Sequence, residues 1–374
     1  MSELKELLEK FDDISKNPYR AVAEHKKNTG KGAVGILPVY APEELVHATG
    51  FLPVGVWGGH IEINKTRAYL PAFACSIMQS IMEMELDGVY DCLDGVLISS
   101  PCDTLKCFGQ KWKGKCPAIQ FVQPQNRNLE SANEFLQEEY RIVRAKIESV
   151  TGVTITDEAL QKSIDVYNEN RAELRRFTAL AAVHPEVISP ADRHHVIKAR
   201  YFMEKGAHTV LLKELNEKLD QMKVSAWKGK KVILTGITAE PDELLDIFAE
   251  NEIAVAADDL AHESRQFRSD TPAGGEPLYQ LARWWQSLQG CSLAADRSKG
   301  RIDMLVDMVK ETGADAVIIC MMKFCDPEEF DYPLIYKRLQ EEKIPNLCIE
   351  IDQESTGYEQ IRTRIESFME MLTQ

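Results

Sequence analysis

Two stretches of the sequence decide the fold: DGVLISSPCD at residues 94–103 and DAVIICMMKFCDP at residues 315–327. Each stretch holds a short apolar run rich in β-branched residues, which is typical of a buried strand in a parallel sheet. A Cys-Asp pair follows each run, at Cys102 and at Cys325, just before a segment with helical character. The chain is therefore predicted to contain two similar halves with equivalent strand ends.

The segments around these two stretches repeat the same alternation. Further strands are predicted at 33–37, 52–56, 118–122, 231–234, 253–256 and 346–350, and helices lie between them, as in βαβ units that feed a parallel sheet. From about residue 129 to 222 apolar residues recur at helical spacing instead. We predict an N-terminal α/β domain over 1–128, a helical insertion or linker domain over 129–226 and a C-terminal α/β domain over 227–374.

The composition indicates which kinds of partner the protein binds and in which cell compartment it is found. The 374 residues include 44 basic and 59 acidic side chains, a net charge of -15, which disfavours binding to nucleic acid. No run approaches the roughly 18–20 apolar residues that cross a bilayer, and the charged N-terminus is unlike a signal peptide. We expect a cytoplasmic protein without a membrane or nucleic-acid partner.

Nine cysteines need an explanation, because a reducing compartment disfavours disulfides. Cys75, Cys102 and Cys325 each stand where a helix is predicted to begin, and a helix N-terminus favours the thiolate form that metals require. Three such thiolates would hold an iron–sulfur cluster, or a zinc ion with one position open. No C-x₂-C-x₂-C run is present, so buried structural thiols or a catalytic thiol stay open as alternatives.

Four longer segments carry a resemblance to a known family. They are YAPEELVHATGFLPV at 40–54, CDTLK at 102–106, KFCDPEEFDYP at 323–333 and IPNLCIEID at 344–352. In order and spacing they resemble the signatures of the 2-hydroxyacyl-CoA dehydratase family, which also includes benzoyl-CoA reductase subunits. The resemblance covers nearly the whole chain outside its helical middle.

The resemblance implies two Rossmann-like domains, a helical domain and a [4Fe–4S] cluster held by three cysteines. Carried over residue by residue, the iron ligands are Cys75, Cys102 and Cys325. Cys107 and Cys320 are the alternatives that lie close by in the sequence. Tyr40 and Glu44 fall in the segment that approaches the cluster in the family, so the resemblance gives them a role beside the cluster, although helix capping alone explains the acid.

The resemblance also implies a reaction and partners. Members of the family are oxygen-sensitive enzymes of anaerobic amino-acid fermentation that convert an (R)-2-hydroxyacyl-CoA into the 2-enoyl-CoA. One electron added to the thioester carbonyl gives a ketyl radical that expels the 2-hydroxyl group and acidifies the β-proton. This chain resembles the smaller subunit of the heterodimer, which relays the electron, while the homologous larger subunit binds most of the substrate.

The sequence contains neither a G-x-G-x-x-G strand-to-helix turn nor a G-x-x-x-x-G-K-[ST] loop. ATP would therefore be hydrolysed by a separate iron–sulfur activator protein, as the resemblance implies. Two other interpretations remain open: a subunit of the benzoyl-CoA reductase type, and a non-catalytic scaffold or activating protein.

Overall fold

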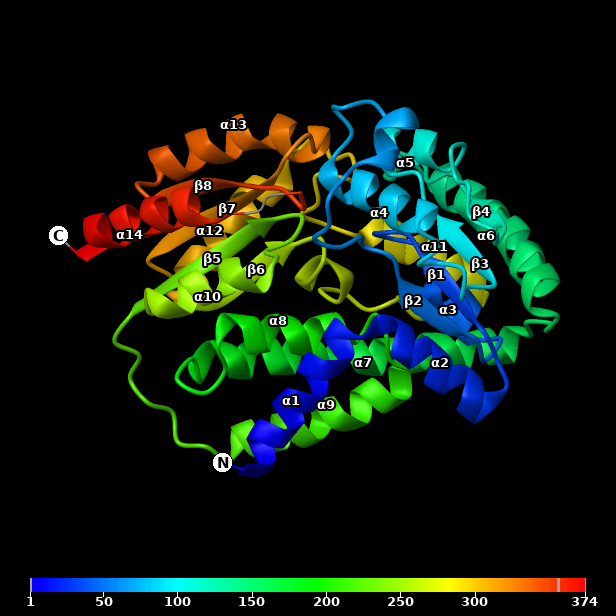
Figure 1. Ribbon diagram of the computed structural model, residues 1–374, viewed down its shortest axis with the longest axis horizontal. Coiled ribbons are helices and arrows are strands. Elements are labelled where there is room, and N and C mark those ends of the chain that lie inside the picture. The colour runs from blue at the N-terminus through cyan, green and yellow to red at the C-terminus, as the bar shows by residue number, and fades with distance from the viewer. Residues whose placement is uncertain (1, 355–356, 374) are drawn as a thin grey trace.

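A computed structural model describes residues 2–354 and 357–373 and contains two four-stranded parallel sheets (Figure 1). The strands are β1 (Ala33–Ile36), β2 (Leu52–Gly55), β3 (Gly95–Ile98), β4 (Ala118–Gln120), β5 (Lys230–Gly236), β6 (Ile253–Leu260), β7 (Ala316–Met322) and β8 (Asn346–Ile351). The helices are α1 (Ser2–Lys16), α2 (Pro18–Thr29), α3 (Glu43–His47), α4 (Ser76–Leu86), α5 (Asp103–Phe108), α6 (Glu130–Thr151), α7 (Asp157–Val183), α8 (Pro190–Ala199), α9 (Lys205–Asp220), α10 (Asp242–Glu250), α11 (Pro277–Ser287), α12 (Gly300–Thr312), α13 (Asp326–Glu341) and α14 (Glu359–Thr373), with 3-10 turns η1 (Lys65–Ala68) and η2 (Ser264–Gln266).

The two sheets have the same topology. Their strand orders are β2-β1-β3-β4 and β6-β5-β7-β8, and every neighbouring pair is parallel. The central strands β1, β3 and β7 are buried along their whole length, because helices cover both faces of a parallel sheet. The prediction of an α/β protein built from two similar halves is confirmed.

An aspartate aligns the start of each sheet. Asp94 precedes β3, and its Oδ2 accepts a hydrogen bond of 3.0 Å from the backbone N–H of Ala33, in β1. Asp315 precedes β7, and its Oδ2 accepts one of 2.8 Å from the backbone N–H of Lys231, in β5. Gly32 leaves the space that Asp94 needs, because a Cβ there would lie 1.8 Å from the aspartate Oδ2. The two halves therefore use the same side chain at the same place.

Helices α6 to α9 interrupt the alternation, and their ends follow local sequence signals. Thr156 caps α7, Ser189 and Asp192 form a reciprocal capping box at α8, and Gly152 ends α6 in the left-handed conformation. Helix α1 packs along α8, and its Leu4, Leu7 and Phe11 share a core with α7 and α9. In Figure 1 α1, α7, α8 and α9 lie along one side of both sheets, whereas α6 lies next to β3 and β4. The predicted domain boundaries near residues 128 and 226 stay predictions.

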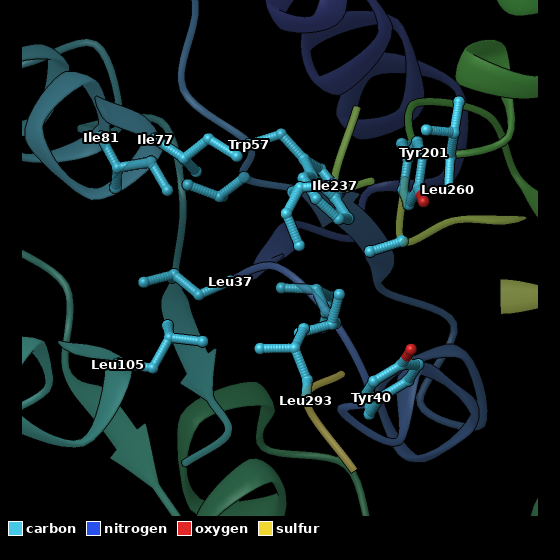
Figure 2. Packing of buried hydrophobic residues seen from close by; sticks show 14 of the residues in the cluster. Leu37, Tyr40, Trp57, Ile77, Ile81, Leu105, Tyr201, Ile237, Leu260 and Leu293 are labelled. Atoms are coloured by element: carbon cyan, nitrogen blue, oxygen red, sulfur yellow. The ribbon is translucent and has the colours of Figure 1, made fainter. Parts of the chain in front are cut away.

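One hydrophobic core joins the two halves. It contains residues from both sheets and from α4, α5 and α11. Figure 2 shows Leu37 and Leu105 from the first half packed in the same cluster as Ile237, Leu260 and Leu293 from the second. The carboxyl ends of the strands in both halves therefore face one shared interior. Within the described residues, no helix is long and apolar enough to span a membrane.

Candidate functional site

Three cysteines stand at the N-caps of three helices. Cys75 precedes α4, Cys102 precedes α5 and Cys325 precedes α13. Burial raises the pKa of each of these thiols, and backbone N–H groups in the first turn of each helix, those of Met78, Leu105 and Glu328 among them, offset part of that rise. The first half supplies two of the three thiols and the second half supplies one. The sequence predicted this placement at helix starts.

The structure brings these three thiols into one electrostatic neighbourhood. Burial raises the pKa of Cys325 well above its usual value, and the nearby sulfurs of Cys75 and Cys102 raise it further. Burial likewise raises the pKa of Cys75 to about 12, with Cys102 and Asp326 contributing. Burial and the neighbouring sulfurs thus both favour the neutral form of these thiols.

The spacing of the thiols differs from that of a single-ion site. Four ligands at 2.3 Å from a tetrahedral zinc ion would place their sulfurs roughly 3.8 Å apart. In the described part of the chain, two groups of three acidic or nitrogen ligands have all their donor atoms within 4.8 Å of one another, and neither contains a cysteine. The open alternative of a preformed zinc site at the three cysteines is therefore not supported.

The two alternative cysteines occupy other environments. Cys320 lies inside β7, where it is fully buried and lies opposite Gly236 and Ile349 in the neighbouring strands. Cys107 is exposed within α5. Neither cysteine caps a helix, so the geometry favours the set Cys75, Cys102 and Cys325.

Tyr40 and Glu44 are both buried, but they have different partners. The Tyr40 hydroxyl donates a hydrogen bond of 2.7 Å to the Sγ of Cys291, and burial raises the tyrosine pKa. Glu44 forms a buried ion pair of 2.5 Å with Arg171, in the helical segment. Glu44 thus connects the first half to α7. A role for either residue beside a cluster stays a prediction.

A chain of contacts connects Tyr40 to the third cysteine. Cys291 lies 3.5 Å from the Nη1 of Arg265, which donates a hydrogen bond of 3.0 Å to Glu328. The backbone N–H of Glu328 in turn contacts the thiol of Cys325. The sequence patterns did not single out Cys291, Arg265 or Glu328. A lone cysteine between two polar segments carries no signal in a single sequence.

Buried charges surround this chain of contacts. Arg301 donates to Asp259 and to Glu328, each at 2.8 Å, while Arg265 pairs with the same two carboxylates at 3.0 Å. All four side chains are at most 4% exposed. The opposing charges balance, and the arginines hold the pKa of Asp259 well below its usual range despite burial. This pairing fixes the start of α13 and therefore Cys325.

A cavity of about 450 Å³ lies beside two of the cysteines. Its lining includes Ser76 and Phe324, the immediate neighbours of Cys75 and Cys325, and the polar residues Arg67, Lys323 and Glu354. Metal sites need an entry path. The cavity reaches the sequence neighbours of two of the cysteines, but none of the three thiols belongs to its lining.

Comparison with known proteins identifies the family. Residues 38–372 match the model of the family described as 2-hydroxyglutaryl-CoA dehydratase, D-component. The chain is 54% identical to the lactoyl-CoA dehydratase subunit beta of Anaerotignum propionicum over the full length of both. It is 42% identical to the (R)-phenyllactyl-CoA dehydratase beta subunit of Clostridium sporogenes, also over both full lengths.

A third relative, the (R)-2-hydroxyglutaryl-CoA dehydratase subunit beta of Acidaminococcus fermentans, is 38% identical, and the alignment covers 98% of this chain and 99% of the relative. All three relatives are named as beta subunits of dehydratases, which are hydro-lyases. The resemblance deduced from the sequence is confirmed. The chain belongs to the 2-hydroxyacyl-CoA dehydratase family and is a subunit of a hydro-lyase.

Proposed function

We propose that this chain is the smaller, electron-relaying subunit of an (R)-2-hydroxyacyl-CoA dehydratase. The observation that carries the proposal is the sequence similarity of this chain, over nearly its whole length, to the beta subunits of three dehydratases. The names of these three relatives contain different acyl groups. A beta subunit implies a partner, for which we propose a homologous larger subunit that binds most of the 2-hydroxyacyl-CoA. The reaction removes the 2-hydroxyl group and the β-proton as water.

We further propose that Cys75, Cys102 and Cys325 hold a [4Fe–4S] cluster. Soft thiolate donors suit iron–sulfur clusters, and these three come from separate segments but share one electrostatic environment. When bound, the cluster supplies one-electron transfer at low potential. The fourth iron position would be left to a group other than these three thiols.

The chain's own residues would prepare that site. Helix N-terminal N–H groups stabilise the thiolates, and the ion pairs of Glu328 with Arg265 and Arg301 fix the helix that carries Cys325. The hydrophobic core under the site excludes water. Hydrogen bonding and burial around sulfur ligands are the protein's means of setting a cluster's potential.

Exposed aromatic side chains near the cysteines support a partner surface. Phe73 is 72% exposed and lies two residues before Cys75, and Phe330 is 79% exposed and lies five residues after Cys325. Aromatic residues are enriched in protein–protein contacts. We propose that an ATP-dependent iron–sulfur activator or the larger subunit contacts this surface.

The test is iron and sulfide content of protein purified without air together with its partner subunit. Cys75→Ala, Cys102→Ala and Cys325→Ala should each lose most of the iron and at least 100-fold of the dehydration of a 2-hydroxyacyl-CoA. The matched controls Cys320→Ala and Cys107→Ala should keep the iron. Circular dichroism would verify that every variant is folded.

Three results would contradict the proposal. Full iron content in a folded Cys102→Ala, Cys325→Ala double variant would exclude these thiols as ligands. Reduction of an aromatic thioester without dehydration of any 2-hydroxyacyl-CoA would instead assign the chain to the benzoyl-CoA reductase type. A colourless protein that still supports activity in the partner would indicate a scaffold.

A further inference from the structure

A second cluster of ligating side chains lies away from the cysteines. His194 comes from α8, Glu240 from the loop between β5 and α10, and His262 follows β6. Their donor atoms all lie within 4.8 Å of one another, and both histidines are only 1% exposed. The three residues join the helical segment to the second sheet, and the proposed function uses none of them.

The distances suit a small metal ion. His194 Nε2 lies 3.1 Å from Glu240 Oε1, and His262 Nδ1 lies 3.8 Å from Glu240 Oε2. Nitrogen and oxygen ligands at about 2.0–2.1 Å from a tetrahedral zinc ion are roughly 3.4 Å apart. The two measured separations lie on either side of this value, so small side-chain movements would close the site around an ion.

The environment of His194 is that of a metal ligand with an orienting partner. Its Nδ1 lies 2.8 Å from Glu263 Oε1, and Glu263 is itself held by an ion pair with Arg193. A carboxylate on one ring nitrogen fixes the ring and directs the other nitrogen to the metal. Here the other nitrogen faces Glu240.

His262 turns its Nδ1 towards Glu240, and this nitrogen also lies 3.3 Å from Thr238 Oγ1. Within the described residues its Nε2 is buried and has no hydrogen-bond partner, whereas buried polar atoms are normally satisfied. Its ring packs against Trp57, with centroids 4.3 Å apart, and stacks on Tyr201 at 4.9 Å. These contacts hold the imidazole in place. The fold therefore maintains a rigid histidine next to a carboxylate without satisfying both of its nitrogens.

The site also has an opening. Glu240 and His262 line a cavity of about 520 Å³ that lies between the two sheets and the start of α2, together with Lys198 and Asp352. An ion could enter through it, and a water or small ligand there could complete the coordination. Three protein ligands with one open position is the arrangement of zinc sites that act on a bound molecule.

We propose that His194, Glu240 and His262 bind one divalent transition-metal ion of the zinc class, with the remaining coordination position open to the cavity. Without the ion, Lys198 pairs with Glu240. Lys198 is 27% exposed, so it can move into the cavity when the ion displaces it from the carboxylate. Imidazole ligands suit zinc, copper, iron and nickel. The inference stands independently of the proposed cluster, because it uses other residues.

The test adds Co²⁺ to the cluster-loaded complex after chelation, without air. One equivalent should bind with visible ligand-field bands and without the near-ultraviolet bands of cobalt–thiolate bonds, which would report the cysteines. His262→Gln and Glu240→Gln should weaken binding at least 100-fold, and Glu263→Gln should weaken it about 10–100-fold. His60→Ala, which changes another histidine on the cavity lining, should bind Co²⁺ as the unchanged protein does.

Each alternative outcome overturns the inference. Unchanged affinity in a folded His262→Gln variant would exclude the site, and so would Co²⁺ bound only with thiolate bands or no stoichiometric binding. Because His194 is fully buried, His194→Ala could unfold the chain. His262→Gln and Glu240→Gln retain side-chain volume, so these two variants test the site in place of His194→Ala.

Discussion

The two α/β halves share a backbone plan but differ in the chemistry at one helix position. Cys102 and Cys325 cap equivalent helices at the ends of equivalent strands. Three residues later the first half has Leu105, buried in the common core, whereas the second has Glu328, buried in a network of arginines. The repeat therefore preserves where a thiol is placed, while the second half adds charged groups that can act on it.

The two halves also differ in the acidic residue with which each contacts the helical segment. After the first strand of each half comes a helix that carries an acid in its first turn. Glu43, in α3, contacts Tyr167, Arg200 and Lys205, and Asp242, in α10, contacts His195 and Lys16. One acid is buried and the other is partly exposed. Equivalent contacts should therefore differ in strength, which the following variants measure.

The largest loss of stability is expected at Glu328, whose equivalent position in the first half is the apolar Leu105. Glu328→Gln removes the charge that pairs with Arg265 and Arg301 and leaves two buried cations with one carboxylate fewer. Loss of one partner of a buried ion pair costs about 3–5 kcal/mol, and urea unfolding of the chain would measure it. Glu341→Gln, on the exposed end of the same helix, should cost less than about 1 kcal/mol. Equal effects would show that the network adds nothing to stability.

A pH-dependent effect of similar size is expected at Glu43. Burial alone would raise its pKa, but Lys205 and Arg200 lower the pKa to about 2 from an ordinary value of 4.5. Because the folded value lies below the unfolded one, this stabilisation is present above pH 4.5 and is lost as the pH falls from 4.5 towards 2. The contribution is about 3 kcal/mol. Glu43→Gln should remove this part of the acid dependence in unfolding experiments at several pH values.

The matched variant in the other half is Asp242→Asn. A hydrogen bond from His195 lowers the pKa of Asp242, but its side chain is 37% exposed, so solvent screens the interaction. We expect less than half of the destabilisation measured for Glu43→Gln at pH 7. A larger loss for Asp242→Asn would reverse the proposed ranking of the two contacts.

The sequence predicted the parts of the molecule that local patterns encode. All eight strands and the main helices between them were predicted from apolar runs. Cys102 and Cys325 were predicted as helix caps from their position after those runs, and Cys75 from its position before a helical segment. The contacts between distant segments could not be read in this way. Cys291 lies 251 residues from its partner Tyr40, and Arg265 lies 63 residues from Glu328. Such pairs depend on how the halves pack, which periodicity in a single sequence does not encode.

The smallest expected effect concerns the aspartates that align the two sheets. Asp94→Ala and Asp315→Ala each remove a hydrogen bond from a strand N–H, at 3.0 and 2.8 Å, so each should cost about 1 kcal/mol. Asp315→Ala also removes a partly exposed ion pair with Lys230, at 3.4 Å, which should add less than about 1 kcal/mol. Urea unfolding of both variants, with the exposed Asp307→Ala of α12 as the control, would measure the difference. Matching losses would indicate that the two halves keep this interaction for the same structural reason. A loss confined to Asp315→Ala would mean that the first sheet holds its register through packing of the core instead.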